Sequence, residues 1–245
     1  MKSEYPKELQ RQFEQAIIQG SFSRGNVLAL DDLAARFRTS VNQMRLVVQT
    51  AHRKGLLGKI EADLGTVQVL GLPKTEFASV FTHTAKAGFK PTSLVRRVVV
   101  EPASPQVADR LKVKASSPVY RYVRTRNVDG QPLANQTNFM PFAVCPGLED
   151  DDVSRYSFQR LLEEKYFSVL TEMQEAYSLI PSTGQDRDVL KLPEGASVLV
   201  VDRIALSATN WPLVWATIRI RPDRYQYVAA LWPQAAHLLE EGSSE

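Results

Sequence analysis

Apolar residues recur at three- and four-residue spacing at the start of the chain, which is the pattern of an amphipathic helix. In the first predicted helix, over residues 6–19, the apolar positions are Leu9, Phe13, Ala16 and Ile17. Pro6 in the first turn and Gly20 after the last turn are the usual residues at the two ends of a helix. This segment is therefore predicted to bury one face of a helix.

Two shorter helices are predicted next. One begins with an aspartate cap at position 31 or 32 and ends near Phe37, and the other is capped by Thr39 or Ser40 and runs to about Lys54. One side of the second helix is apolar, at Val41, Met44, Val48 and Ala51. Its other side carries Asn, Gln and Arg. Two short helices joined by a tight turn, with the second polar outside, are typical of a helix-turn-helix.

A short β-hairpin is predicted after Gly55, which ends the third helix. Its arms are residues 56–60 and 66–70, and its turn is Asp63-Leu-Gly65. A helix-turn-helix followed by a hairpin is the order of a winged helix, so residues 1–71 are predicted to bind DNA. A break at Gly71-Leu-Pro-Lys74 and a helix over residues 75–87 make residues 72–88 a linker.

From Lys90 onward the pattern changes to strands with a few interspersed helices. The predicted strands cover residues 94–100, 119–127, 133–140, 170–180, 197–206 and 213–220, and the predicted helices cover 106–111 and 158–165. Turns at Asp129-Gly130 and Thr209-Asn210 join two pairs of strands into hairpins. This order favours an α+β domain with a largely antiparallel sheet, over residues 89–238.

The distribution of charge supports the DNA-binding prediction. The net charge of the whole chain is only +3. Between Ala34 and Lys59, however, there is no Asp or Glu, and the basic residues are Arg36, Arg38, Arg45, Arg53, Lys54 and Lys59. A positive surface of this kind suits a phosphate backbone. The competing interpretation is a solvated helix face.

Other classes of protein find little support. Cys145 is the one cysteine, and its apolar flanks predict a buried thiol and not a nucleophile. The three histidines lie far apart, and no catalytic set or metal-ligand spacing occurs, so we expect no enzyme, metal or cofactor. No apolar run has the length of a membrane span, and the first residues lack a signal-peptide core. We therefore expect a cytoplasmic protein.

Residues 5–71 resemble the winged helix of the GntR superfamily. The matching positions are Gly20, Gly25, Leu33-Ala34, Phe37, Ser40, Arg45, Gly55-Leu56-Leu57 and Gly65-Thr66. The resemblance implies a DNA-binding set of Arg36, Arg38, Ser40, Asn42, Gln43, Arg45, Gly65 and Thr66. The chain departs from the family at Val41, Gln43 and Asp63, where the family has Arg, Thr and Gly. Because these positions touch DNA in the family, we expect a different operator or weaker binding.

Residues 88–231 resemble the UTRA domain of the HutC-type branch. The landmarks that carry the resemblance include Gly88-x-x-Pro91-x-Ser93, Arg124-Thr-Arg126, Phe139-Met-Pro141, Ser157-Phe158, Glu172-x-x-x-Ala176 and Arg203. The resemblance implies a chorismate-lyase-like fold, a small-molecule effector and a homodimer. It places the effector near Thr92, Ser93, Arg124, Arg126, Gln136 and Ser157.

The predicted effector is anionic. Arg124 and Arg126 are two residues apart on one strand and so share a face, and two converging guanidinium groups favour an anion. The competing interpretation pairs them with Asp129 or Glu172. At Gln136 and Val214 the chain lacks carboxylates that the sugar-binding members use, which argues against a polyhydroxylated sugar. Trp211 and Trp215 either line this pocket or pack on the sheet.

These observations predict a transcriptional regulator, expected to be a repressor, whose dimer binds an inverted repeat in double-stranded DNA. One alternative is an interaction protein that keeps the fold and has lost DNA binding. A second is an enzyme of the chorismate-lyase fold.

Overall fold

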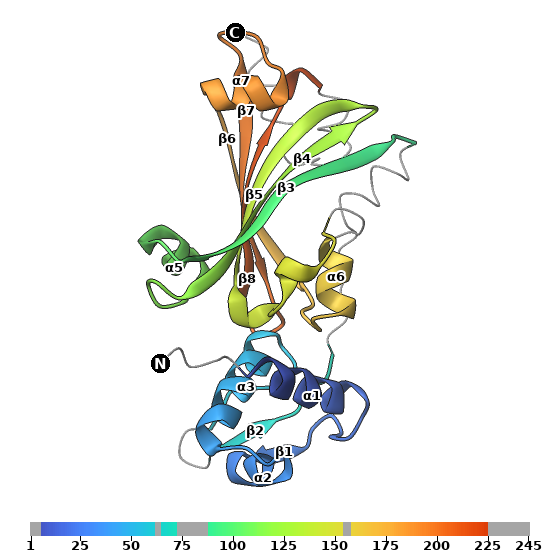
Figure 1. The fold of residues 1–245 in the computed structure, drawn as a ribbon, viewed down its shortest axis with the longest axis vertical. Coiled ribbons are helices and arrows are strands. Elements are labelled where there is room, and N and C mark those ends of the chain that lie inside the picture. Colours follow the sequence, from blue (N-terminus) through green and yellow to red (C-terminus); the bar gives the residue numbers. More distant parts are fainter. Residues whose placement is uncertain (1–5, 62–64, 73–87, 154–157, 225–245) are drawn as a thin grey trace.

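The computed structural model describes residues 6–61, 65–72, 88–153 and 158–224. In these residues a small helical domain lies at one end of a long six-stranded sheet (Figure 1). No helix in the described ranges is long and apolar enough to cross a membrane.

The first domain is a winged helix. Its elements are α1 (Lys7–Ile18), β1 (Val27–Ala29), α2 (Leu30–Arg36), α3 (Val41–Arg53) and β2 (Thr66–Gln68). Its core collects the apolar faces of the three helices and of β2, and the most deeply buried side chains include Phe13, Leu33, Met44, Val48, Leu57 and Val67. The predicted helical periodicity is confirmed.

The helix ends differ slightly from the prediction. α2 begins at Leu30, and its cap, Ala29, makes no side-chain hydrogen bond. Asp31 and Asp32 lie in the first turn, where carboxylates interact favourably with the helix dipole. Ser40 is the cap of α3, because its hydroxyl accepts a hydrogen bond from the Gln43 N–H.

The predicted wing hairpin is only partly right. The two predicted arms do meet, through the bridge of Leu57 to Val69 and the hydrogen bonds from the Gly58 N–H to the Gln68 carbonyl and from the Leu70 N–H to the Leu56 carbonyl. The prediction missed β1, which pairs antiparallel with β2. A three-residue strand such as β1 is too short to show a period-two pattern. The predicted turn residue Asp63 and the predicted linker helix over residues 75–87 lie outside the described residues, so the boundaries at 71 and 89 stay predictions.

The second domain is built on one antiparallel sheet, as the sequence predicts. Its strand order is β3 (Pro91–Pro102), β4 (Pro118–Val128), β5 (Gln131–Pro141), β8 (Pro212–Ile220), β7 (Ser197–Leu206) and β6 (Glu172–Pro181). Every pair of neighbours is antiparallel. The α+β class is therefore confirmed, with strand ends that shift by a few residues.

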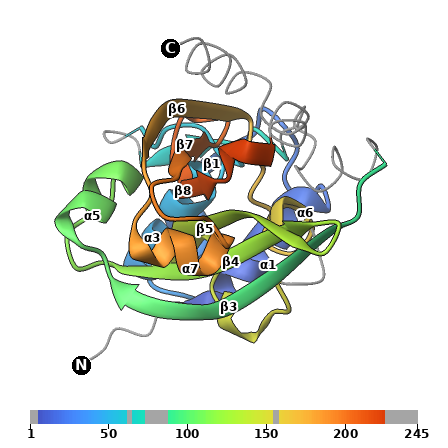
Figure 2. The same ribbon diagram turned by 90° about the horizontal axis from the view of Figure 1, so that it is seen from above.

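Helices cover both faces of the sheet. α6 (Phe158–Glu164) packs on the face that carries Tyr120 and Tyr122. α5 (Pro105–Leu111) packs on the opposite face, and Figure 2 shows α5 and α6 far apart on the two sides. The structure adds α7 (Gly184–Leu190), which the prediction missed.

Candidate functional site

Strand alternation brings Arg124 and Arg126 to the face of the sheet that α6 covers. In the register of β4, Arg124 lies opposite Gln136 of β5, and Arg126 lies opposite Ser93 of β3. The side chain of Arg124 is buried, since its residue is 7% exposed. The predicted pair of cations therefore shares one face, as period two requires.

One amide oxygen orients both guanidinium groups. Gln136 Oε1 accepts hydrogen bonds from Arg124 Nε, at 3.0 Å, and from Arg126 Nε, at 3.3 Å. Gln136 Nε2 donates in turn to Asn138 Oδ1, at 2.7 Å. Within the described residues, the terminal nitrogens of the two arginines make no hydrogen bond or ion pair. They remain available to acceptor atoms of a ligand.

The predicted carboxylate partners do not neutralise this pair. Asp129 accepts a hydrogen bond from the Lys90 N–H at the β4–β5 turn, and Glu172 accepts one from Gln174. Burial lowers the pKa of Arg126 well below its usual value, and the nearby Arg124 lowers this pKa further. Arginine keeps its proton in proteins. The lowered pKa therefore reflects an electrostatic cost that a bound anion would offset.

Other polar residues extend the same face, and the sequence analysis did not assign them to the site, although Arg203 is one of the landmarks of the resemblance. Arg203 of β7 forms an ion pair with Glu175 of β6, which also accepts a hydrogen bond from the Tyr177 hydroxyl. The Tyr122 hydroxyl and Asn138 Nδ2 are buried and have no partner in the described part of the chain. The signal that could have found them is strand alternation, because they occupy the same face as Arg124.

In this arrangement cations and donors outnumber carboxylates. Arg124, Arg126 and Arg203 share the face with the carboxylate of Glu175, which pairs with Arg203, and farther along the same face Glu149 accepts a hydrogen bond from Tyr120. Burial raises the pKa of Tyr122, so its phenol keeps a proton to donate. A ligand with several acceptor oxygens and negative charge matches these groups chemically.

The remaining predicted effector residues are placed differently. Ser93 lies beside Arg126 on the same face. Thr92 is exposed and, as the preceding strand residue, belongs to the opposite face. Ser157 lies outside the described residues.

The two tryptophans do not join the arginine pair. Trp215 lies on the opposite face, where its ring stacks on Phe139 at 5.2 Å and its Nε1 donates to Asp202. Trp211 lies under the guanidinium group of Arg53, at 4.7 Å. Val214 occupies the same face as Arg124 and is buried. The sheet-packing interpretation therefore holds for Trp215.

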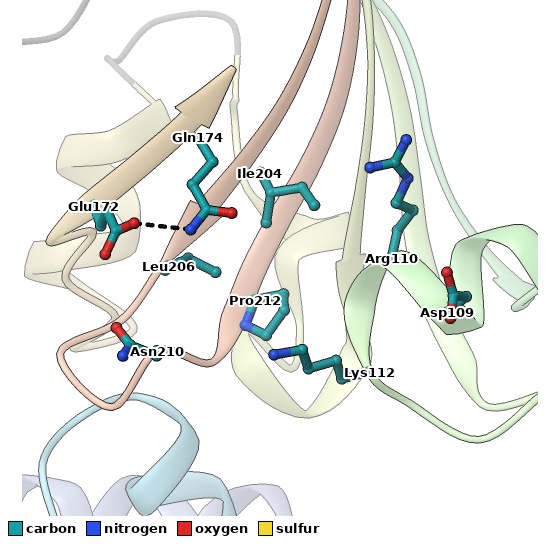
Figure 3. A pocket seen from close by; sticks show the side chains of 9 residues that line it. All are labelled: Asp109, Arg110, Lys112, Glu172, Gln174, Ile204, Leu206, Asn210 and Pro212. Atoms are coloured by element: carbon teal, nitrogen blue, oxygen red, sulfur yellow. Dashed lines mark hydrogen bonds between the residues drawn. The ribbon is translucent and has the colours of Figure 1, made fainter. Parts of the chain in front are cut away.

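An open cavity of about 460 Å³ lies on the α5 side of the sheet (Figure 3). Lys112 and Arg110 approach it from one side, and Glu172 and Gln174 from the other. Arg110 is paired with Asp202. Because both signs of charge line this cavity, it does not select a charged ligand as the arginine pair does.

The predicted DNA-binding residues gather around α2, α3 and the start of β2. Asn42, Gln43 and Arg45 are exposed on α3, and Arg36 and Arg38 are exposed at the end of α2. Local contacts hold three of the predicted residues: Arg36 lies over the Phe22 ring, Ser40 caps α3, and Gln43 accepts a hydrogen bond from Thr39. Gly65 and Thr66 are partly buried at the start of β2.

The predicted basic block divides in two, which corrects the sequence interpretation. Arg36, Arg38, Arg45 and Lys59 are exposed. Lys54 is instead 1% exposed and forms an ion pair with Glu14, and Arg53 packs on Trp211. Two of the six cations therefore do not contribute to a DNA-facing surface.

Cys145 is buried, as predicted, and burial raises the pKa of its thiol. A protonated, inaccessible thiol is a poor nucleophile. The described ranges contain no group of three or more His, Cys, Asp and Glu residues that could hold a metal ion.

Known proteins are similar to this chain over one or both domains. The UTRA domain family matches residues 86–226. The HTH-type transcriptional regulator Rv0792c of Mycobacterium tuberculosis is 27% identical over 226 residues, which cover 88% of this chain and 81% of that protein. The HTH-type transcriptional regulator YurK of Bacillus subtilis is 22% identical over 140 residues, so the match spans only 58% of its length.

Among solved structures, PhnF from Mycobacterium smegmatis has the same fold, with a TM-score of 0.56. The two proteins are 16% identical, and the similarity covers 88% of this chain and 95% of PhnF.

Proposed function

This chain belongs to the UTRA-domain family of GntR-type transcriptional regulators, and we propose that it is a repressor released from DNA by a small anionic effector. The observation that carries the proposal is the uncompensated pair Arg124 and Arg126. Arg124 is buried and Arg126 is partly buried, and such a cation pair is costly without a counter-charge, which a carboxylate or a phosphate ester supplies.

The polar neighbours narrow the chemistry of the effector. Gln136 uses its carbonyl to hold both arginines, so this residue offers an incoming hydroxyl little acceptor capacity. The unpaired donors of Tyr122 and Asn138 add to the demand for acceptor atoms. A small acid or phosphate ester satisfies these donors better than a neutral sugar does.

The proposed DNA-binding unit is a homodimer on an inverted repeat, because one winged helix reads only a few base pairs. Arg36, Arg38, Ser40, Asn42, Gln43, Arg45, Gly65 and Thr66 form the proposed contact surface. Light scattering should give twice the mass of one chain at micromolar concentration. A mass of one chain would contradict the dimer.

A ligand screen tests the effector proposal. Carboxylates, phosphate esters and neutral sugars are added to wild type, Arg126→Ala and Arg121→Ala, and thermal unfolding is followed. Arg121 is the matched control, because it lies on the same strand, faces the other side and is paired with Glu101. An anion should stabilise wild type and Arg121→Ala but not Arg126→Ala.

A neutral ligand that stabilises all three proteins equally would overturn the anionic effector. Gel shifts with promoter DNA from the gene's own locus complete the test. The active anion should release that DNA from wild type and leave it bound to Arg126→Ala. Absence of any shift would favour the alternative of a protein that has lost DNA binding.

A further inference from the structure

Two consecutive residues, Tyr166 and Phe167, belong to different hydrophobic cores. Tyr166 packs with Tyr122, Phe158 and other residues beneath the sheet, whereas Phe167 packs against the core of the winged helix. The segment that follows α6 therefore fastens the two domains together. Figure 1 shows α1 and α3 facing this end of the sheet.

A buried charged pair lies at this junction. Lys54, at the end of α3, and Glu14 of α1 approach to 2.8 Å, and their side chains are only 1% and 4% exposed. Lys54 Nζ also donates to the main-chain carbonyl of Tyr166, at 2.7 Å. The ammonium group of the winged helix thus binds a backbone oxygen of the other domain.

A second donor binds a second backbone oxygen. Gln10 Nε2 donates to Glu14 Oε1, at 2.9 Å, and to the carbonyl of Ala143, at 3.1 Å. Ala143 lies in the 3₁₀ turn that follows β5. The latch, defined here as Gln10, Glu14 and Lys54, therefore presents two donors to two carbonyls of the second domain.

The β7–β8 turn makes a separate contact with the same end of α3. Thr209 Oγ1 donates to the His52 carbonyl, at 2.8 Å, and Arg53 stacks on Trp211. The His52 carbonyl also accepts a hydrogen bond from the Gly55 N–H, at 2.9 Å, so the Thr209 hydroxyl is a second donor to this oxygen. The end of the proposed recognition helix is consequently held by the second domain.

The energetics favour a reversible contact. Removing two charges from water carries a large free-energy cost, which their attraction offsets only in good geometry. Burial accordingly raises the pKa of the Glu14 carboxyl, an effect that Lys54 opposes. When the domains separate, water can solvate both groups. A contact of this kind selects one relative position of the two domains but adds little net free energy to that docked state.

Each carbonyl that the latch binds is next to an element of the candidate effector site. Ala143 follows β5, which carries Gln136, and Tyr166 follows α6 and packs against the cluster that contains Tyr122. The β7–β8 turn extends from the strand of Arg203. A ligand that shifts β5, α6 or β7 would therefore alter the acceptors that the latch needs.

We propose that Gln10, Glu14 and Lys54 form a latch that docks the winged helix on the second domain in one register, and that effector binding changes how much of the protein is docked. The second half of this proposal rests on the proposed function, whereas the docking itself does not. The relative position of the two recognition helices in a dimer differs between the docked and the undocked protein. The docked fraction therefore sets the affinity for the operator.

Calorimetry of the ligand-free, full-length protein tests the latch without DNA or effector. Wild type should unfold in one transition, because the domains are fastened. The double variant Lys54→Met/Glu14→Leu removes both charges, keeps apolar bulk and deletes the donor to Tyr166. It should unfold in two transitions. Gln10→Leu leaves the ion pair in place, so the midpoint temperatures of its two transitions should lie closer together than in the double variant.

The matched control lies on the same helix. Glu8 and Arg11 form an exposed ion pair on α1, so Glu8→Gln/Arg11→Met changes the same charges without touching the junction. This control should keep the single transition. Hydrogen exchange gives a second readout: amides of residues 52–58 should exchange roughly tenfold faster in the double variant, as expected for losing a charged hydrogen bond.

A single transition and unchanged exchange in the folded double variant would overturn the latch. Suppose that the double variant shows two transitions and faster exchange, but that no anion changes the amide exchange rate of residues 52–58 in wild type. The docking by the latch is then supported, and its link to the effector is contradicted. If anions bind at Arg126 but the latch variants behave as wild type, the proposed function stands and the latch fails.

Discussion

Gly55 and Ala208 meet across the boundary between the winged helix and the sheet domain. A β-carbon on residue 55 would lie 3.1 Å from the β-carbon of Ala208, and the Gly55 backbone has a φ of +83°. The C-terminal end of α3 can therefore approach the β7–β8 turn this closely only because residue 55 has no side chain.

Gly55→Ala is expected to destabilise the protein by more than the backbone strain alone. The left-handed conformation costs an L-residue about 1–2 kcal/mol, and the contact with Ala208 adds to this. Gly20→Ala is the matched control, because Gly20 has a φ of +79° and a β-carbon there would meet no described atom within 4 Å. Urea unfolding should therefore give a lower free energy of unfolding for Gly55→Ala than for Gly20→Ala. Adding Ala208→Gly to Gly55→Ala should recover part of the difference. Equal losses would contradict the close contact.

Gln136→Glu should convert the arginine pair into a neutralised cluster. A carboxylate at this position would accept charge-assisted hydrogen bonds from Arg124 and Arg126. We expect the ligand-free protein to gain about 1–3 kcal/mol of unfolding free energy and to lose the stabilisation that anions give wild type. Thermal unfolding with and without anions measures both effects. Gln136→Leu, which removes the shared acceptor, should instead destabilise the ligand-free protein.

Asp186→Asn should lower stability at neutral pH and much less in acid. Asp186 is 3% exposed, accepts a hydrogen bond from Arg219 Nη2 at 2.7 Å, and caps α7 together with Thr183. Burial alone raises the pKa of the Asp186 carboxyl, but the hydrogen bonds from Arg219 and Thr183 outweigh it and hold this pKa below its ordinary 3.8.

The depressed pKa sets the sign of the pH dependence. Such a carboxylate stabilises the fold above the pKa of the unfolded chain, and the stabilisation is lost as pH falls through the folded-state pKa. The difference between wild type and Asp186→Asn should be about 1.5–3 kcal/mol at pH 7 and should shrink below pH 3.8. A difference that stays constant in acid would exclude the ionised carboxylate as its source.

Arg45→Ala should weaken DNA binding while leaving the fold intact. Arg45 is exposed on α3 and makes no structural contact that its loss would disturb in the described residues. Operator affinity should fall by about 1–3 kcal/mol if the side chain reads a base, or the salt dependence should flatten by about one if it binds a phosphate. Arg11→Ala, an exposed change on α1, should leave both quantities unchanged. Fluorescence anisotropy over a salt series distinguishes these outcomes.

The sequence predicted the elements whose pattern is long enough to repeat. The strands of the sheet and the shared face of Arg124 and Arg126 follow from a period of two, and α1 and α3 follow from the helical period. β1 is three residues long and gives no repeating pattern. α7 has the same seven-residue length as α5, which was predicted, so its length does not explain why it was missed. The Thr183 to Asp186 capping box was the available signal for α7.

Lys54 shows why the rest could not be predicted. Along the chain it is one cation in a basic block, and its partners are Glu14, 40 residues earlier, and the Tyr166 carbonyl, 112 residues later. No local sequence pattern predicts contacts between residues so far apart in the sequence. Tyr122 and Asn138 likewise read as ordinary strand residues until the register of β4 and β5 sets them side by side.

The junction between the domains uses side chains on one partner and only main-chain oxygens at the latch on the other. Any polypeptide that follows the same path after β5 and α6 offers those oxygens, whatever its side chains are. Substitutions at residues 143 and 166 would therefore leave these two hydrogen bonds intact, whereas the contacts of Phe167, Thr209 and Trp211 with the winged helix depend on their side chains. A winged helix from another regulator would therefore need the amide, carboxylate and ammonium at the three latch positions, and a glycine at position 55 beside Ala208, before operator choice and ligand choice could be recombined.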